Sequence, residues 1–356
     1  MPLLLAIVIL SIAVLAHEFG HFLLAKRAGI KVEEFGIGFP PRILKLAERD
    51  GTIYSLNAIP FGGFVRILGE DDPTVKGGFA SQPKRVRSLV LLAGPAMNVL
   101  LGVVLFTAAF MSGYPAPLYK VKVVEVAPGS PAAKAGLKAG DIILSVDGNS
   151  LQKPSELSDY TREHLGEEIT LLVKRGEEEF QLTLVPRPKP PPNEGPMGIV
   201  IGMATTRKRA SLPEALLLSL HSTVIIFLLM LSIPFLALMG KVPLSELRPV
   251  GPVGATRLAV DMAQQSVTTG WWFPFLIFMG FLNVALAEAN LLPIPGLDGG
   301  RLLFVVLEAI RGKRVDYRRE SWVHMVGFLI LIALMVIVTY FDVTAPLRGQ
   351  NWGEFF

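Results

Sequence analysis

Long runs of apolar residues dominate the pattern of this chain. About 20 apolar residues in a helix cross the hydrocarbon core of a bilayer, and four runs reach that length. They extend from about residue 3 to 25, from 89 to 111, from 271 into the segment NLLPIPGLDGG, and from 323 to 341. The first run starts without a basic leader or a small-residue cleavage site, so we expect it to be retained as a span. The pattern therefore predicts a polytopic α-helical membrane protein with four transmembrane helices.

A fifth apolar run, from about residue 215 to 239, has the length of one more helix, and hydropathy alone would make it a fifth span. Its interpretation depends on basic residues, because cytoplasmic loops carry an excess of Lys and Arg. If the basic loops share the cytoplasmic side, the chain from 112 to 270 starts and ends outside and holds an even number of spans. We therefore expect 215–239 to lie on the outer surface, broken near Pro234, within a periplasmic-side interfacial segment of residues 212–269. The residues in these loops are Lys26, Arg27, Lys31, Arg42, Lys45, Arg49, Lys84, Arg85, Arg87, Arg311, Lys313, Arg314, Arg318 and Arg319.

Two other segments lack the pattern of a membrane helix. Residues 32–68 are rich in Gly and Pro and contain the strand-like runs TIYSLNAI and FVRIL. We expect a membrane-associated β-element folded against the first span, and an ordinary cytoplasmic hairpin is the alternative. Residues 119–188 alternate strand and helix patterns, and VAPGSPAAKAGLKAGDIILSVDG resembles a bacterial PDZ domain. Domains of that kind bind extended peptides at a strand edge. We thus expect an inserted PDZ-like α/β domain, with the proline-rich residues 186–192 as its exit linker.

Composition supports a membrane protein that carries soluble parts. Hydrophobic residues make up 51% of the 356 positions and charged residues 18%. The net charge of +4 is modest and lies mostly beside apolar runs, so a nucleic-acid partner is not expected. The chain has no cysteine, which excludes disulfides and thiolate metal ligands. The expected parts are a membrane part at 1–111, the PDZ-like domain at 119–188, the interfacial segment at 212–269 and a second membrane part at 270–356.

A polar cluster, HEFGH, interrupts the first apolar run. Its histidines, His17 and His21, are four residues apart, so on a helix both imidazoles project from one face. This spacing suits two ligands of a tetrahedral zinc ion. Glu18 stands next to them and can act as a general base towards a water molecule. The motif inside a span predicts a hydrolase that works within the membrane.

A third protein ligand must come from another segment, and Asp298 is the best candidate. It follows the third apolar run. Placing a carboxylate within the membrane costs free energy, so such a residue is a candidate for a functional role. Pro293 and Pro295 break the helix just before it, and its depth then matches that of the two histidines. A capping role beside glycine is the simpler alternative for this residue. We expect the other histidines to be ordinary surface or interface residues: His164, His221 and His324.

Taken as a set, the motifs of this chain resemble the site-2 protease family of intramembrane zinc metalloproteases, and most closely the bacterial regulator-of-sigma-E protease group. They are HEFGH, YSLNAIPFGGFV, LLAGPAMN, GPVG and NLLPIPGLDGGR, together with the PDZ-like domain. The resemblance covers nearly the whole chain. It implies that Zn²⁺ is held by His17, His21 and Asp298, and that Glu18 is the catalytic base.

The resemblance also implies residues that bind substrate. Asn290 would engage the substrate backbone, and the element containing Gly62 and Gly63 would lie beside it, since glycine permits a close backbone approach. Pro293 and Pro295 remove amide donors near Asn290, which leaves carbonyls there for other partners.

Two features depart from the pattern of the resembled group. This chain has one PDZ-like domain where some relatives have two. Glu288 also stands in the apolar run AEAN, where we expect an aliphatic residue. Its side chain either faces protein or has a role beside the site.

The sequence therefore predicts a zinc-dependent intramembrane endopeptidase of the bacterial cytoplasmic membrane. The active site would face the cytoplasmic side, and the PDZ-like domain would lie outside. The implied substrates are transmembrane segments of anti-sigma factors after a first cut, and signal-peptide remnants; a peptide could also bind the PDZ-like domain. A non-catalytic membrane PDZ scaffold is the main alternative. A metal transporter is a weaker one, because no chain of ionisable residues crosses the spans.

Overall fold

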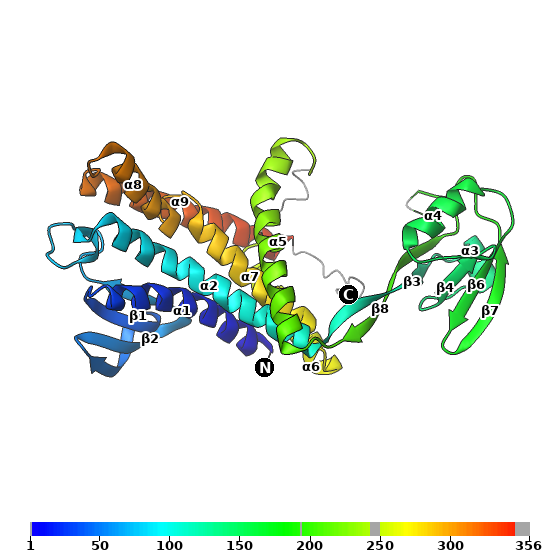
Figure 1. The fold of residues 1–356 in the computed structure, drawn as a ribbon, viewed down its shortest axis with the longest axis horizontal. Helices are drawn as coiled ribbons and strands as arrows, with labels where there is room; N and C mark the ends of the chain where they lie inside the picture. Colours follow the sequence, from blue (N-terminus) through cyan, green and yellow to red (C-terminus); the bar gives the residue numbers. More distant parts are fainter. Residues whose placement is uncertain (1, 193, 243–249, 346–356) are drawn as a thin grey trace. The chain divides into compact units, whose positions relative to one another are not determined.

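A computed structural model of the chain describes residues 2–192, 194–242 and 250–345. The chain forms two compact units (Figure 1). Of the described residues, one unit contains 2–113, 210–242 and 250–345, and the other contains 114–192 and 194–209. The second unit is thus inserted between the two halves of the first, as the sequence predicted.

The first unit is a bundle of long helices. Gly102, in the second long helix, lies very close to the long helix that contains Gly280. An added Cβ at Gly102 would come within 3.3 Å of the Gly280 carbonyl oxygen. Small residues at such interfaces let membrane helices approach closely. The predicted polytopic α-helical class is confirmed. The four predicted spans correspond to α1 (Pro2–Arg27), α2 (Lys84–Gly113), α7 (Phe273–Leu291) and α9 (Tyr317–Thr344), with α2 packed against both α1 and α7 (Figure 1).

The fifth apolar run forms α5 (Leu212–Leu238), a single helix that continues through Pro234. The predicted break near Pro234 is therefore wrong, because a long apolar helix tolerates the loss of one amide donor. The residues that α5 buries all lie in its first half, where the Thr107 hydroxyl donates to that of Ser219 at 2.9 Å. By length and hydropathy α5 qualifies as a span alongside α2, α7 and α9. The location of residues 212–269 on the outer surface stays a prediction.

The GPVG motif begins α6 (Pro252–Thr269), and its role is structural. The backbone N–H of Gly254 donates to a carboxylate oxygen of Asp342 at 2.8 Å, and that of Gly251 donates to the other oxygen at 3.4 Å. Asp342 is buried near the end of α9. A carboxylate is favourable at the N-terminus of a helix, where amide groups have no partner within the helix. The last span thus caps α6.

The predicted β-element is confirmed as an antiparallel pair, β1 (Val32–Arg49) and β2 (Thr52–Ile67), packed against α1. Both strands bend midway, so residues 34–37 pair with 53–56 on one side and with 63–66 on the other, and Val32 pairs with Ile67. Residues 63–67 therefore form an edge. Gly62 and Gly63 lie against Val14 and Leu15 of α1, where a Cβ would meet atoms at 2.8 and 2.4 Å. The two glycines allow this edge to approach α1.

The second unit is an α/β domain, which agrees with the predicted PDZ-like insertion. Its buried core includes Val121, Val123, Ile143, Leu157 and Leu171. The sheet order is β7-β6-β4-β3-β8, and a short strand, β5, also pairs with β4. The elements are β3 (Tyr114–Val126), α3 (Pro131–Ala135), β4 (Ile142–Val146), β5 (Asn149–Ser150), α4 (Pro154–Glu163), β6 (Ile169–Arg175), β7 (Glu178–Leu184) and β8 (Ile199–Lys208).

This unit is longer than the predicted 119–188, because β8 returns to pair with β3. The proline-rich residues 186–192 are consequently not the exit linker that the sequence suggested. They begin a loop inside the unit, in which the Arg187 N–H donates to the Pro196 carbonyl at 2.9 Å. The chain leaves the unit only after β8.

Candidate metal centre

The HEFGH motif lies in the interior of α1, and both of its imidazoles are buried. His17 is 8% exposed and His21 is 7% exposed. They face α2, and the backbones of the two helices are in direct contact at this level. A Cβ on Gly20 would lie 2.2 Å from the Ala93 carbonyl oxygen, so only glycine fits there. This contact fixes the distance of the two imidazoles from α2.

Asp298 is the first residue of α8 (Asp298–Arg311), which follows the loop after α7. The two glycines after it explain how it reaches the histidines. A Cβ on Gly299 would lie 2.2 Å from the Leu292 carbonyl oxygen, and one on Gly300 would lie 2.3 Å from that of Ile294. The start of α8 can therefore rest on the backbone of the loop, and this packing presents the carboxylate to α1.

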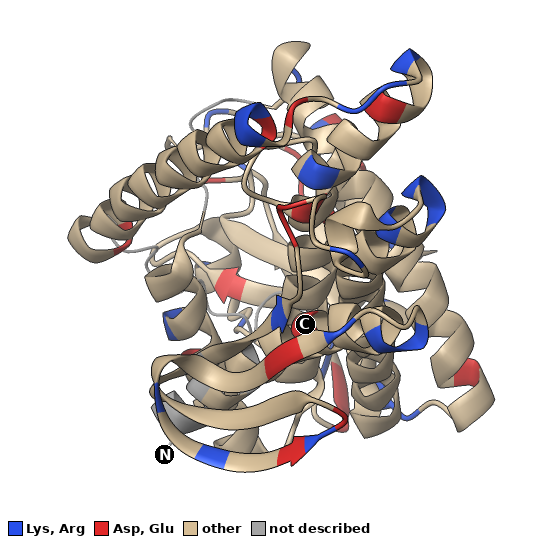
Figure 2. Ribbon diagram, turned by 90° about the vertical axis from the view of Figure 1, so that its left-hand side faces the viewer, with Lys and Arg blue, Asp and Glu red and all other residues tan. Residues whose placement is uncertain are grey.

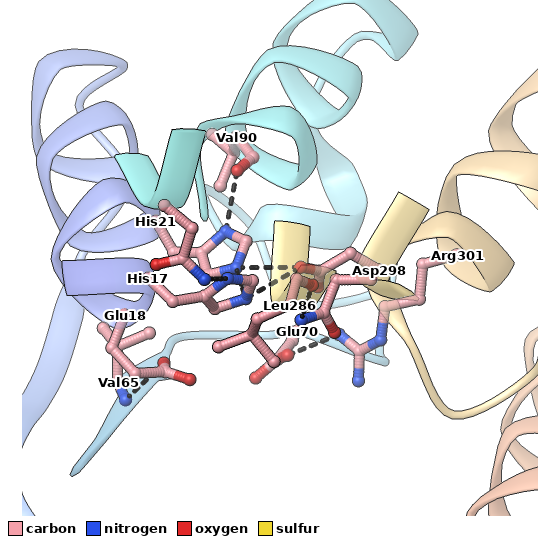
Figure 3. Close-up of polar contacts among 11 residues, drawn as sticks. His17, Glu18, His21, Val65, Glu70, Val90, Leu286, Asp298 and Arg301 are labelled. Carbon is pink, nitrogen blue, oxygen red and sulfur yellow. Dashed lines mark hydrogen bonds and ion pairs between the residues drawn. The ribbon is translucent and has the colours of Figure 1, made fainter. Parts of the chain in front are cut away.

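Three ligand atoms from these two segments converge (Figure 3). Asp298 Oδ2 lies 3.0 Å from His17 Nε2 and 3.2 Å from His21 Nε2, and the two Nε2 atoms are 3.1 Å apart. Zn–N and Zn–O bonds of about 2.0–2.1 Å place tetrahedral ligands about 3.3 Å from one another. The observed triangle fits zinc closely. Among the described residues, this is the one cluster of three His or carboxylate side chains close enough to share a metal ion.

Each imidazole has a neighbour on α2 at its other nitrogen. His21 Nδ1 lies 2.8 Å from the Val90 carbonyl oxygen, and His17 Nδ1 lies 3.4 Å from Asn98 Nδ2. Gly94 lies between Val90 and Asn98 on α2 and packs against both imidazole rings. An added Cβ at Gly94 would come within 2.4 Å of His21 Nε2. The sequence pattern by itself gave these three α2 residues no role. A glycine and an asparagine within an apolar helix were the available signal.

Glu18 faces the edge of the β-element. Its Oε2 accepts a hydrogen bond of 3.1 Å from the Val65 backbone N–H, on the side of residues 63–67 that is not paired with β1 (Figure 3). The carboxylate therefore lies between the metal ligands and a strand edge that, among the described residues, pairs with no further strand. That is where a general base must be if an extended peptide pairs with this edge.

A cavity of about 280 Å³ joins these groups. It contains the predicted ligands and Glu18, and Asn290 also lines it. Arg301 lines it too and pairs with Glu70 and Asp71 from the loop after β2. Its described lining comprises His17, Glu18, His21, Phe64, Val65, Ile67, Glu70, Phe79, Val90, Leu91, Asn290, Gly296, Leu297, Asp298 and Arg301.

Four predicted substrate residues are not part of that described lining. Gly62 and Gly63 instead bring the strand edge to α1, and Pro293 and Pro295 shape the loop before Asp298. Their contact with substrate stays a prediction. Glu288 is buried at 8% exposure and also lies outside the described lining, which favours a side chain that faces protein.

Among the described residues, the cluster of possible metal ligands includes none of the three remaining histidines. His164 stacks on Tyr160 in the second unit, and His221 is exposed on α5. His324 Nδ1 accepts the Gly296 N–H at 3.0 Å and so holds the loop before Asp298. They are surface or interface residues, as expected.

Comparisons with known proteins agree with the geometry. The model of peptidase family M50 matches residues 5–334. The chain is 28% identical over 422 residues to the zinc metalloprotease RasP of Oceanobacillus iheyensis, covering 95% of this chain and 97% of that protein. It is 29% identical over 420 residues to RasP of Geobacillus kaustophilus, covering 95% and 96%. Among solved structures, the PDZ domain of an SdrC-like protein from Listeria monocytogenes is 28% identical, covers 23% of this chain and 85% of that one, and has a TM-score of 0.21.

Proposed function

This chain belongs to peptidase family M50, and from that membership we propose how its residues cut peptide bonds inside the membrane. It is a zinc-dependent intramembrane endopeptidase of the site-2 protease type and a multi-pass membrane protein. We assign His17, His21 and Asp298 as the zinc ligands. The observation that carries this assignment is the triangle of ligand atoms 3.0–3.2 Å apart, with Glu18 beside it.

When bound, zinc supplies Lewis-acid chemistry, which polarises the scissile carbonyl and makes a water molecule more acidic. Glu18 is the group that moves protons. It takes one from the attacking water and gives it to the nitrogen of the leaving amine, so that the carboxylate is regenerated. Its hydrogen bond from the Val65 N–H orients the carboxylate towards the cavity.

Substrate must be extended at this site, because carbonyls in a helix are hydrogen-bonded and shielded. We propose that the unwound segment pairs with the edge formed by residues 63–67. Gly62 and Gly63 place that edge against α1, and Asn290 lines the same cavity, with its amide nitrogen donating to the Leu286 carbonyl oxygen at 2.9 Å. Pro293 and Pro295 leave carbonyls near Asn290 without their usual donors. Transmembrane segments of anti-sigma factors and signal-peptide remnants fit this chemistry as substrates, with a second peptide bound at the PDZ-like domain.

We further propose the bacterial cytoplasmic membrane as the location, with the metal centre on the cytoplasmic side. Basic residues gather at the end of the helical unit that carries the start of α2 and the α8–α9 turn (Figure 2). Cytoplasmic loops carry such an excess. Single cysteines test this cleanly because the chain has none. Ser155→Cys should react with an impermeant thiol reagent from outside and Ser81→Cys only from inside; the reverse result contradicts the orientation.

The function itself is tested with purified protein in liposomes and a transmembrane peptide substrate. Glu18→Gln should keep zinc and lose cleavage, because an amide cannot accept the proton. His21→Ala should lose both zinc and cleavage. Full zinc content in His21→Ala contradicts the ligand assignment, and near-normal cleavage by Glu18→Gln removes that residue from the mechanism.

A further inference from the structure

One face of α2 is matched to the two imidazoles of α1. Val90, Gly94 and Asn98 are four residues apart, so they follow one another along this face. Val90 faces His21 through its carbonyl oxygen, Gly94 leaves room for the rings, and Asn98 faces His17.

Asn98 is an unusual residue for this position, because it is fully buried at 0% exposure in an apolar helix. Its Oδ1 has no hydrogen-bond partner among the described residues, while its Nδ2 lies 3.4 Å from His17 Nδ1. An unsatisfied buried carbonyl costs about 1–3 kcal/mol. A side chain kept at such a cost points to a function.

The chemistry of a metal-bound histidine gives Asn98 that function. An imidazole that binds a metal through Nε2 carries its hydrogen on Nδ1 and needs an acceptor there. His21 has one in the Val90 carbonyl oxygen, at 2.8 Å. The Asn98 amide is the group next to Nδ1 of His17. Half a turn about the Cβ–Cγ bond of an asparagine exchanges oxygen and nitrogen within the same space.

We propose that Asn98 Oδ1 accepts the hydrogen of His17 Nδ1 and thereby holds the tautomer whose Nε2 faces the metal. Asn98 is then a positioning residue that acts through His17, and this role rests on the proposed zinc site. Acceptors of this kind are usually worth a factor of 10–100 in metal affinity. A neutral amide supplies the acceptor without adding a third carboxylate next to Glu18 and Asp298.

The test is zinc affinity, measured on purified protein by competition with a chromogenic chelator. Asn98→Leu has a similar size but no acceptor, so we expect its affinity to fall 10–100-fold. Asn98→Asp keeps an acceptor and should stay within about threefold of the native value or bind more tightly. Asn98→Ala repeats the loss without added bulk in case the leucine variant does not fold.

A matched control is available on α7. Asn283 is also 0% exposed and has an Oδ1 without a partner among the described residues, but its Nδ2 donates to the Met279 carbonyl oxygen of its own helix at 2.8 Å instead of facing a metal ligand. Asn283→Leu should therefore leave zinc affinity unchanged. This control separates loss of an acceptor at the metal centre from a general effect of replacing a buried asparagine.

Cobalt spectra provide a second readout. Loss of the Nδ1 acceptor should shift the visible absorption of the Co²⁺-substituted protein in Asn98→Leu and leave it near native in Asn98→Asp. Native zinc affinity in both Asn98→Leu and Asn98→Ala overturns the proposal. An equal loss in Asn98→Leu and Asn98→Asp also overturns it, because the role would then be packing. The zinc assignment fails separately, through full zinc content in His21→Ala.

Discussion

Adding one methyl group at Gly94 should remove zinc from this enzyme. In Gly94→Ala the new Cβ would lie 2.4 Å from His21 Nε2 and 2.8 Å from His17 Nε2. Ordinary contact requires about 3.4 Å, so the His21 ring must move by about 1 Å. The helices cannot separate easily to relieve this, because Gly20 and Ala93 are already in backbone contact.

The size of the effect follows from the bond lengths at zinc. Zn–N distances are about 2.0–2.1 Å, and functional sites hold them within about 0.2 Å. A shift of about 1 Å is roughly five times that tolerance, so one ligand is lost or badly misaligned. Misplacement by about 1 Å can cost a factor of about 100 in rate. We therefore expect Gly94→Ala to lower both zinc affinity and cleavage at least 100-fold.

The assay compares Gly94→Ala with Gly102→Ala, which makes the same change eight residues further along α2. There the added Cβ meets the Val284 side chain at 3.1 Å, and a shift of a few tenths of an ångström relieves it. Alanine favours a helix over glycine by about 1 kcal/mol at both positions, so intrinsic helix stability cannot explain a difference. Zinc is measured by elemental analysis and cleavage in liposomes. Native zinc content and rate in Gly94→Ala would refute the reasoning.

Three further outcomes are expected elsewhere in the chain. Asp342→Ala should destabilise the helical unit by about 1–3 kcal/mol, measured by thermal unfolding in detergent, because two N–H groups of α6 lose their acceptor; an unchanged unfolding temperature contradicts the capping role. In the second unit, burial by itself raises the pKa of Asp141, but its ion pair with Arg175 holds that pKa below the ordinary value. The resulting stabilisation is complete above pH of about 4 and is lost as pH falls through the lower folded pKa. Unfolding reported by a fluorophore on Ser155→Cys should show this acid loss, and Arg175→Met should remove it; a loss that persists in that variant would assign it to other carboxylates. Finally, Gly or Pro near the scissile bond of a substrate span should raise the cleavage rate above that of an all-Leu span, because less helix must be undone; faster cleavage of the all-Leu span at equal binding contradicts pairing with the strand edge.

Features with a local physical basis could be predicted from the sequence. The length of an apolar run sets whether a helix can cross a bilayer, so α1, α2, α7 and α9 were recognised. The spacing of His17 and His21 places both on one helix face in any fold. Strand pattern and turn residues marked the β-element and the inserted domain. These signals need only a few neighbouring residues, and tertiary structure does not change them.

Only the tertiary structure decided which distant groups meet. Asp298 lies 277 residues from His21, and Asn98 lies 81 residues from His17, so sequence spacing says nothing about their contact. Gly94 and Asn98 belong to LLAGPAMN, a motif whose role appears only when α2 is packed on α1. Predictions from the sequence were wrong at two proline positions, where tertiary contacts outweigh the local tendency of proline to end an element. Pro234 does not end α5, and the proline-rich residues after 186 lead back to a strand, because β8 pairs with β3. Local chemistry therefore determined which residues can bind zinc, whereas long-range packing between α1, α2 and the start of α8 determined that they meet with room for one ion.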